Sequence, residues 1–555
     1  MTATAPSGSA ARPLALPAPR PRSDWDAWGT EPARLPAGAK AILATLLPGK
    51  AHPIPRRAHP RLSASRLDDA ALAALGEIVG DDHATRDDAL RLLHLGGKST
   101  PDLLHRRLDE TQSAPDAVVA PADHAEVVAL LAACDRRGIA VVPFGGGTSV
   151  VGGVDPEAGP HRAVIALDLS RTAALLELDE TSLLATLGAG TTGPQAEELL
   201  GARGYTLGHF PQSFQYASIG GYAATRSSGQ ASRGYGRFDE LVHALRVATP
   251  VGDLDLGRAP ASAAGPDLRE LFLGSEGAFG VLTEVTVRIR PVPAATAYGA
   301  WTFPDFASGT AALREATQRG IRPTVLRLSD ETETRVNAAM GGHLTRLRGC
   351  LAVATFEGTD AASAEGTRSE LDAVFAAHGA KSRGEDPARS WERGRFASPA
   401  LRDTLMDAGV LAETLETATT WANLATLKSA VSDALSGTLT AGGAKPIVLC
   451  HISHVYPAGA SLYFTVVAAL SEDPATQWAG AKDAASRAIG DARGTITHHH
   501  AIGRDHRPYL EAEIGPLGVE ILRAVKAVVD PRGIMNPGAL VASGAASGSG
   551  AVDPA

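Results

Sequence analysis

Cysteine is scarce in this chain of 555 residues. Only three cysteines are present, Cys134, Cys350 and Cys450, and they lie far apart in apolar surroundings. An odd number of scattered thiols argues against a disulfide framework and a cysteine-based zinc site, and it favours a reducing compartment. We therefore expect a cytoplasmic protein without structural disulfides.

Excess positive charge is also absent. Lys and Arg number 52 against 61 Asp and Glu, which gives a formal net charge of −9 at pH 7. No stretch combines basic and aromatic residues in the way that nucleic-acid-binding surfaces do. We therefore expect no nucleic acid among the partners.

Long hydrophobic runs are missing as well. The longest, such as Leu462 to Leu470, have the length of a β-strand, whereas a membrane-spanning helix needs roughly 18 or more apolar residues. Residues 1–22 lack the apolar core of a signal peptide, and residues 542–555 are rich in Ser, Gly and Ala. We expect both ends to be disordered tails and the rest to be a globular protein.

The length of the chain exceeds what one hydrophobic core usually supports, so several domains are expected. Helical periodicity precedes residue 115, short apolar runs separated by glycine follow it, and the pattern restarts after Pro291-Val292-Pro293. We predict an α+β fold with an N-terminal helical region (23–114), a first α+β domain (115–293), a second domain with an antiparallel sheet (294–485) and a C-terminal helical segment (486–541).

A glycine-rich loop is the most informative motif. Helical spacing over residues 125–136 ends at Gly138, and the apolar run 139–142 predicts a buried strand that leads into three consecutive glycines. Successive glycine amides can converge on an anion, so the loop favours a phosphate cradle, with a plain turn as the alternative. The spacing matches neither a Rossmann fingerprint nor a P-loop. The loop residues are Pro143, Phe144, Gly145, Gly146, Gly147, Thr148 and Ser149.

Further glycine-rich segments follow at 211–229, 234–236 and 274–281. With the first loop they resemble the FAD-binding domain of the vanillyl-alcohol oxidase and p-cresol methylhydroxylase superfamily. The resemblance implies a two-subdomain FAD-binding domain over 115–293 and a cap domain over 294–485. The alternative is that these segments are unrelated tight turns. The resemblance also implies cofactor contacts from Pro211, Gln212, Ser213, Ser218, Ile219, Gly220, Gly221, Thr225, Arg226, Ser227, Ser228, Glu276, Gly277, Ala278, Phe279, Gly280 and Val281.

The FAD is expected to be noncovalent. Covalent attachment in this superfamily uses a histidine or cysteine close to the ring, and neither residue type occurs in segments 145–154 or 218–229. A linkage through residues 498–500 stays open.

Five further motifs follow one another along the chain. They are Trp25-Asp26-Ala27-Trp28-Gly29, Arg327-Leu328-Ser329-Asp330, Leu401-Arg402-Asp403 with a downstream E-T-x-x-x-W, Gly459-Ala460-Ser461-Leu462-Tyr463-Phe464, and His498-His499-His500-Ala501-Ile502-Gly503. With these motifs the chain is similar, over nearly its whole length, to the alkyldihydroxyacetonephosphate synthase family. Two departures from the family pattern concern the substrate phosphate: Arg504 replaces a usual lysine, and His451 stands where some relatives have an arginine.

This resemblance implies an exchange reaction without net redox change. The acyl group of acyl-dihydroxyacetone phosphate is replaced by a long-chain fatty alcohol in ether lipid synthesis, and the flavin acts as an electron sink. Tyr463 is implied as the acid/base residue and Arg402 and Arg327 as substrate-binding residues. For an isolated motif, a core tyrosine and a solvated arginine paired with Asp403 or Asp407 remain the simpler alternatives.

The histidines 498–500 allow three interpretations. In an extended segment His498 and His500 would face the flavin while His499 points away, and would hydrogen-bond Tyr463 or the leaving carboxylate. A metal site and a purely structural run are the alternatives. We expect catalytic roles for His498, His499 and His500, and no metal.

Two other functions are alternatives to the exchange reaction. One is an FAD-dependent oxidase or dehydrogenase of a hydroxy acid or alcohol, because a fold alone does not determine chemistry. The other is a flavin-binding scaffold, which would need none of Tyr463, Arg402 and the histidines. Because the implied substrates are long-chain lipids, we also expect peripheral docking at a membrane face, and the resemblance implies a homodimer.

Overall fold

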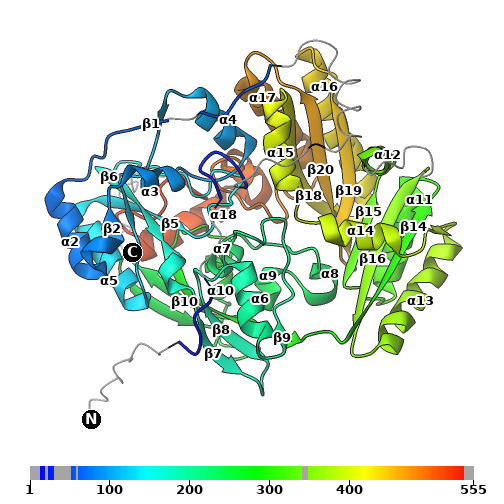
Figure 1. The fold of residues 1–555 in the computed structure, drawn as a ribbon, viewed down its shortest axis with the longest axis horizontal. Helices are drawn as coiled ribbons and strands as arrows, with labels where there is room; N and C mark the ends of the chain where they lie inside the picture. Colours follow the sequence, from blue (N-terminus) through cyan, green and yellow to red (C-terminus); the bar gives the residue numbers. More distant parts are fainter. Residues whose placement is uncertain are drawn as a thin grey trace, which may run out of the picture.

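The computed structural model describes residues 13–18, 23–29, 35, 52–57, 60–340 and 348–542. The expected tails lie mostly outside the described residues. Residues 13–18 differ from the expected tail, because the amides of Leu14 and Ala15 donate to the carbonyl of Leu175 at 2.8 and 3.3 Å. The chain forms a domain with two sheets, at the left of Figure 1, and a cap built on a third sheet, at the right.

The first sheet positions the glycine-rich loop. Strands β4, β6 and β5 run parallel and β2 antiparallel, and all six residues of β6 are buried. Helix α5 (His124–Arg137) ends at Gly138 in the left-handed region (φ 61°) and leads directly into β5. The loop therefore starts at the carboxyl end of a buried strand, as predicted. The order of the strands is β2 (Ala84–Thr85), β4 (Ala117–Val119), β6 (Ala163–Asp168) and β5 (Ile139–Phe144).

The second sheet is antiparallel throughout. Helices α6 (Gly193–Gly201) and α7 (Ile219–Ala224) contribute buried residues to its core. The hydroxyl of Ser218 accepts from the amide of Gly221 at 3.2 Å and caps α7, so the second glycine segment opens a helix. The order of the strands is β11 (Gly252–Leu256), β10 (Val242–Thr249), β12 (Val281–Arg288), β8 (Leu184–Gly188) and β7 (Leu175–Asp179).

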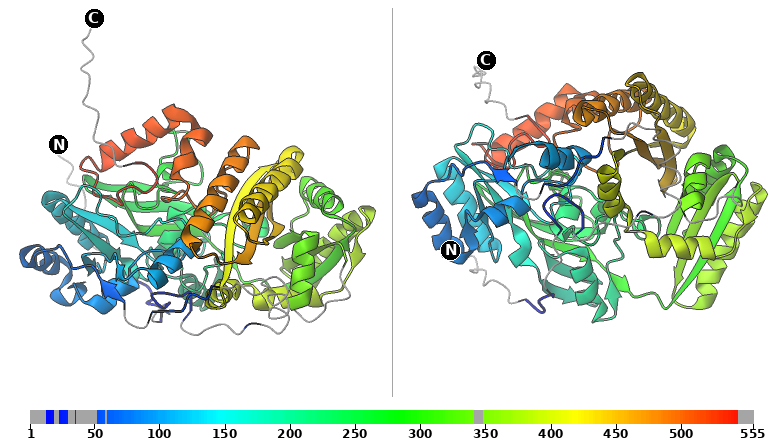
Figure 2. Two further views of the ribbon diagram at one scale, coloured as in Figure 1. Left: turned by 90° about the horizontal axis from the view of Figure 1, so that it is seen from above. Right: turned by 45° about the horizontal axis from the view of Figure 1, so that its top comes forward.

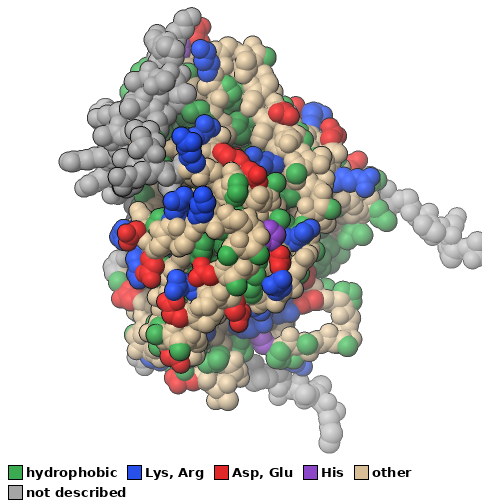
Figure 3. All heavy atoms as spheres, turned by 90° about the vertical axis from the view of Figure 1, so that its right-hand side faces the viewer, with side chains coloured by type: hydrophobic (Ala, Val, Ile, Leu, Met, Phe, Trp, Pro, Cys, Tyr) green, Lys and Arg blue, Asp and Glu red, His purple; other side chains and the backbone are tan. Residues whose placement is uncertain are grey.

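The cap is a seven-stranded antiparallel sheet covered by helices. Helices α11 (Phe306–Gln318), α13 (Ala361–Ala377), α16 (Leu424–Ala441) and α17 (Pro474–Asp491) bury apolar side chains in one core with it. Figure 3 looks onto the cap side, where acidic and basic side chains are interspersed and hydrophobic ones are scattered. The order of the strands is β17 (Lys381–Ser382), β14 (Ala295–Phe303), β16 (Cys350–Gly358), β15 (Val325–Ser329), β19 (Ile447–Val455), β20 (Gly459–Ala469) and β18 (Val410–Thr420).

The N-terminal region and the C-terminal helix pack on the two-sheet half and also contact the cap. Figure 2 shows α18 (Arg507–Val529) on the two-sheet half, in red, beside the orange α17. It is kinked at Gly515 (φ 75°) before Pro516. The chain then runs parallel to β5 at its edge, where the amide of Val141 donates to the carbonyl of Ile534 and the amide of Asn536 to that of Val141, at 2.8 and 2.9 Å. The N-terminal region contains α2 (Asp69–Val79), α3 (Asp88–Leu93), α4 (Thr100–Leu108) and the pair β1 (Arg61–Leu62) and β3 (Thr111–Gln112).

Candidate active site

The predicted glycine segments lie against one another. A methyl group added to Gly145 would come 2.2 Å from the hydroxyl of Ser218, and one on Gly146 would come 2.0 Å from the carbonyl of Tyr216. A methyl group added to Gly277 (φ 75°) would likewise come 2.8 Å from the ring of Pro143. Only glycine permits these approaches. Segments 143–149, 216–221 and 274–281 therefore form one site.

Backbone donors line this site. The amides of Gly146, Gly147, Thr148 and Ser149 have no hydrogen-bond acceptor among the described residues. A row of free amides after a strand is the arrangement that binds phosphate oxygens. The residues present therefore fit the pyrophosphate of FAD.

Glu276 is a buried acceptor in the third segment. It adopts a left-handed backbone (φ 50°), and one carboxylate oxygen accepts from the amides of Ile502 and Gly503 at 3.1 and 2.5 Å. Its other oxygen has no hydrogen-bond partner among the described residues. Burial raises the pKa of Glu276 to about 7. This carboxyl group is thus able to accept from, or donate to, a polar group of a bound cofactor.

Asn536, which was not predicted, holds residues 534–538, which we call the C-terminal strap, against the site. Its side-chain amide donates to the carbonyls of Gly153 and Glu276 at 2.8 and 2.6 Å. Arg504 reaches the same strap by donating to the carbonyl of Pro537 at 2.8 Å and to Gly152. Arg504, one of the two departures from the family pattern, thus bonds backbone next to the glycine loop and the side chain of Asn536 at 3.3 Å.

Other predicted cofactor residues are held by their own partners. The guanidinium of Arg226 donates to the carbonyl of Leu273 and pairs with Asp239 and Glu270, and its backbone is left-handed (φ 50°). Ser227 hydrogen-bonds the buried His209 at 3.1 Å. The side-chain amide of Gln212 donates to the backbone carbonyl of Arg395 in the cap at 2.8 Å.

The three histidines lie on a tight turn around Glu416. The carboxylate of Glu416, buried on β18, accepts from the amides of His498, His499 and His500 at 2.6, 3.1 and 2.9 Å. It also accepts from the hydroxyl of Thr497 at 2.6 Å. The prediction of an extended segment is therefore wrong, because one carboxylate gathers all three amides. Glu416 lies in the E-T-x-x-x-W motif, but nothing in the sequence links it to residues 498–500.

Burial controls the ionisation of this turn. Desolvation holds the pKa of His498, His499 and His500 below the ordinary value, so the imidazoles are neutral near pH 7. Burial alone would raise the pKa of Glu416, but the imidazoles and the hydroxyl of Thr497 outweigh it and hold that pKa well below its usual range. Glu416 is thus an anion surrounded by donors.

Tyr463 on β20 lies among imidazole rings. Its ring stacks on His451 at a centroid distance of 4.9 Å and lies 6.0 Å from His499 and 5.9 Å from His500. His498 hydrogen-bonds the hydroxyl of Tyr456 at 2.6 Å instead, and the described residues contain no hydrogen bond between a histidine and the Tyr463 phenol. Burial raises the pKa of Tyr463 to about 12, so the phenol carries its proton at neutral pH.

Arg402 on α15 (Ser398–Asp407) faces the same region. It pairs with Glu413 at 3.3 Å and donates to the carbonyl of Lys98, while its Nε has no partner among the described residues. Its alternative partners are engaged elsewhere: Asp407 pairs with Arg107, and Asp403 accepts from the amide of Trp28. Arg402 therefore retains hydrogen-bonding capacity for a substrate.

Arg327 on β15 belongs to a compact charged cluster. Its guanidinium donates to Glu333 at 2.5 Å and to Nδ1 of His451 at 3.0 Å, and His451 also contacts Glu333 at 3.1 Å. Burial alone would raise the pKa of Glu333, but His451 and Arg327 lower it to about 2. Because His451 stacks on Tyr463, this cluster borders the tyrosine.

Two contacts connect the cap residues to the flavin segments. Arg237 donates to the carbonyls of His498 and Arg226 at 2.8 and 3.0 Å. The peptide of Lys98 accepts from Arg402 through its carbonyl, and its amide donates to Ser149 at 2.6 Å. The structure therefore brings the predicted cofactor and catalytic residues together at the domain junction.

The histidines also meet the spacing of metal ligands. Ligand atoms of His454, His498 and His499, and of Glu416, His499 and His500, lie within 4.8 Å of one another. His454 is already bonded to the carbonyl of Gly229 at 3.1 Å, and both oxygens of Glu416 accept from amides. We keep the prediction of a hydrogen-bonded site without metal.

Comparisons with known proteins agree with this geometry. Residues 115–255 match the family described as "FAD binding domain", and residues 292–540 match "FAD linked oxidases, C-terminal domain". The two-subdomain fold also appears in p-cresol methylhydroxylase with bound substrate, at 14% identity and a TM-score of 0.66, covering 85% of this chain and 97% of that chain. The predicted fold and the FAD cofactor are confirmed.

Alkyldihydroxyacetonephosphate synthases give higher similarity. The protein from Trypanosoma brucei brucei is 33% identical over 84% of this chain and 80% of its own length, and the one from Dictyostelium discoideum is 30% identical over 82% and 78%. A solved alkyldihydroxyacetonephosphate synthase superposes with a TM-score of 0.78 at 27% identity, covering 90% of this chain and 92% of that chain. Since both the sequence and the fold match over most of their length, the chain belongs to the alkyldihydroxyacetonephosphate synthase family.

Proposed function

We propose that the protein exchanges the acyl group of acyl-dihydroxyacetone phosphate for a long-chain fatty alcohol, with no net oxidation or reduction. The relatives carry the name of this activity. The observation that carries the proposal is the placement of Tyr463, Arg402 and the histidine turn at the edge of the flavin segments. A simple flavin-binding scaffold would not need them.

Bound FAD would lie on the amides of the Gly145 loop and supply an electron sink for the substrate carbon that loses its acyloxy group. The free Nε of Arg402 and the Arg327–His451 cluster are suited to the phosphate or the leaving carboxylate, because guanidinium groups bind both oxyanions in bidentate fashion. These groups would fix the substrate between the cap and the cofactor.

Tyr463 is proposed as the acid/base residue for the proton of the reacting carbon. Its phenol is protonated in the resting site, so it has to release this proton, to a neutral imidazole or to solvent, before the phenolate can accept the proton from carbon; the positive charge of Arg402 acts to lower its pKa. The neutral imidazoles of His499 and His500 lie against its ring and are available to the leaving carboxylate. An acid/base residue of this kind contributes roughly 100- to 10,000-fold to a rate.

Replacing this phenol tests the proposal. Tyr463→Phe should lower the rate of ether formation by at least about 100-fold while FAD binding is unchanged. The assay incubates purified protein with acyl-dihydroxyacetone phosphate and labelled hexadecanol and follows ether product and hydrogen peroxide. Tyr298→Phe, which removes a cap hydroxyl bonded to Glu392, is the matched control. Full activity of Tyr463→Phe would exclude its role, and substrate-dependent peroxide without ether would indicate an oxidase.

Cytoplasmic location, a homodimer and membrane contact stay predictions. Among the described residues, no helix combines the length and hydrophobicity needed to span a bilayer. Contact with lipid substrates would then take place at the surface of the protein.

A further inference from the structure

The motif Trp25-Asp26-Ala27-Trp28-Gly29, which we call the tryptophan turn, packs against the helix that carries Arg402. The backbone amide of Trp28 donates to a carboxylate oxygen of Asp403 at 2.8 Å, and the guanidinium carbon of Arg402 lies 5.6 Å from the centre of a ring of Trp28. Trp28 is only 6% exposed, so packing holds its indole in this position. A motif without a role in the proposed reaction therefore lies against a proposed substrate-binding residue.

Trp28 and Arg402 share one acceptor. The carbonyl of Lys98 accepts a hydrogen bond from the indole Nε1 of Trp28 at 3.2 Å and another from the guanidinium of Arg402. A carbonyl oxygen has two lone pairs, so it can serve both donors at once. The amide of Lys98 donates to the carbonyl of Ser149 at 2.6 Å, and the shared acceptor is thereby fixed to the glycine-rich loop.

The tryptophan turn is anchored by contacts that do not involve Arg402. The carbonyl of Trp25 accepts from the guanidinium of Arg106 at 2.7 Å and from the ammonium of Lys98 at 3.3 Å. The side chains of Arg56 and Asp26 form an ion pair at 3.3 Å. These bonds attach the turn to the N-terminal region, so the position of the indole is set before the arginine is considered.

The guanidinium of Arg402 has three fixed neighbours. One of its nitrogens pairs with Glu413 at 3.3 Å, a second donates to Lys98, and the indole of Trp28 lies against the group. Glu413 is itself held, because it accepts from the amide of Thr100 at 2.7 Å. The Nε of Arg402 has no partner in the part of the chain that the structure describes. The three neighbours thus determine the direction in which this N–H points.

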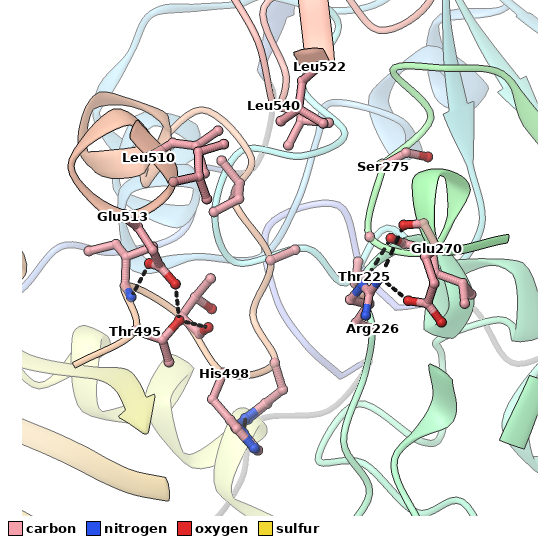
Figure 4. Close-up of a pocket in the computed structure, with 18 of the residues that line it drawn as sticks. Thr225, Arg226, Glu270, Ser275, Thr495, His498, Leu510, Glu513, Leu522 and Leu540 are labelled. Atoms are coloured by element: carbon pink, nitrogen blue, oxygen red, sulfur yellow. Dashed lines mark hydrogen bonds and ion pairs between the residues drawn. The ribbon is translucent and has the colours of Figure 1, made fainter. Parts of the chain in front are cut away.

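The arginines on the flavin side of the site have less to offer an anion. Figure 4 shows Arg226 bonded to Glu270 at the wall of a pocket of about 430 Å³ within the site. Arg226 also pairs with Asp239, and Arg237 pairs with the same aspartate and donates to two backbone carbonyls. The cap arginines, Arg402 among them, are therefore left for the negative charge of a substrate.

We propose that Trp28 is a positioning residue that directs the free N–H of Arg402 toward an oxyanion of the substrate, by sharing the Lys98 carbonyl and by lying against the guanidinium. The inference rests on the proposed function, since the substrate supplies the oxyanion as its phosphate or its leaving carboxylate. Without the indole, the guanidinium has more freedom, and the ligand has to order it on binding. Affinity for the anion should then fall.

Anion titrations of the FAD-loaded protein test the proposal without turnover. Dihydroxyacetone phosphate carries the phosphate and octanoate carries the carboxylate, and calorimetry measures the affinity for each. Arg402→Ala identifies which anion the arginine binds, and Trp28→Phe should weaken the same anion about tenfold. Trp301→Phe removes another buried indole, bonded to Asp372 at 2.7 Å, and should bind both anions like the wild type. Flavin absorbance and the melting temperature check that each variant is folded.

A double variant separates positioning from a purely structural role. In the Arg402→Ala background, Trp28→Phe should change the affinity for the anion by less than about twofold, because the side chain that it orients is gone. Four results would overturn the proposal: wild-type affinity of Trp28→Phe, wild-type affinity of Arg402→Ala for both anions, the same tenfold loss with and without Arg402, and an equal loss in Trp301→Phe.

Asp403 gives a second route if Trp28→Phe does not fold. Asp403→Asn keeps an acceptor for the amide of Trp28 and should bind the anion better than Asp403→Ala, which releases this amide. Equal affinities of these two variants would contradict the proposal.

Exchange assays separate the inference from the reaction itself. Trp28→Phe should lower kcat/KM for acyl-dihydroxyacetone phosphate about tenfold and leave kcat/KM for hexadecanol unchanged. A wild type without exchange activity would refute the proposed function, whereas the anion titrations would still decide the role of Trp28.

Discussion

Glu416 shows how much one residue organises at this site. A single buried carboxylate supplies acceptors for three consecutive amides and the hydroxyl of Thr497, and thereby sets where three imidazoles point. Hydrogen bonds to a buried charge contribute about 1.5–3 kcal/mol each. The catalytic geometry of the turn therefore depends on a residue that need not touch substrate.

Glu416→Gln should separate positioning from binding. The amide keeps the size of the side chain but loses the charge and one acceptor, so we expect ether formation to fall at least about 100-fold and the melting temperature to drop, with FAD retained. Glu370→Gln on the exposed side of α13 is the control. Near-normal activity with an unchanged melting temperature would contradict the role of Glu416.

The raised pKa of Glu276 leads us to expect that the stability of the protein depends on pH. Burial raises its pKa from 4.5 to about 7, so between these values the folded protein binds more protons than the unfolded chain. Stability should therefore fall as pH rises through this window, by up to on the order of 3 kcal/mol from this group. Melting temperatures of Glu276→Gln should vary less between pH 5 and 7 than those of the wild type, and equal slopes would show that Glu276 does not titrate there.

At the scale of elements, the positions of the glycine segments are fixed because other residues lie directly against them. The Gly145 loop contacts the segment before α7 at distances that leave no space for a methyl group. The loop is therefore held by its neighbours, while the amides of Gly146, Gly147, Thr148 and Ser149 find no acceptor in the part of the chain that the structure describes. The strand and helix on either side thus position the amide donors, and glycine allows the two segments to approach each other closely.

Gly146→Ala should therefore release the cofactor. Its methyl group would lie 2.0 Å from the carbonyl of Tyr216, and the loop must move to relieve the clash. We expect FAD affinity to fall at least about 100-fold, measured by flavin fluorescence on reconstitution, and the purified protein to be pale. Gly366→Ala in α13, where nothing lies within 4 Å, should keep its flavin. Tight FAD binding by Gly146→Ala would exclude the loop as the cradle.

Local elements were predictable from sequence to within a few residues. The helix expected at 125–136 spans His124–Arg137, and the strand expected at 139–142 spans Ile139–Phe144. Both are specified by apolar spacing and by Gly138, which are local signals. The segment 498–500 was not predictable in this way, because its turn depends on a carboxylate about 80 residues earlier in the chain.

At the scale of the whole molecule, the site belongs to no single domain. The two-sheet half supplies the amide cradle, the cap supplies Tyr463 and Arg402, and the C-terminal strap supplies Asn536. The motifs identified the family and the participating segments. Cross-domain contacts such as the Lys98 peptide between Ser149 and Arg402 follow from packing and leave no local pattern in the sequence.

The strap over β5 also bears on how the protein is made. Asn536 bonds to Gly153 and Glu276, yet it emerges from the ribosome almost 400 residues after the glycine loop. The nascent two-sheet half therefore lacks its final fastening throughout translation of the cap. Flavin that binds during synthesis would therefore meet a site without the hydrogen bonds of Asn536. Its full affinity would be reached only after residue 536 has left the ribosome.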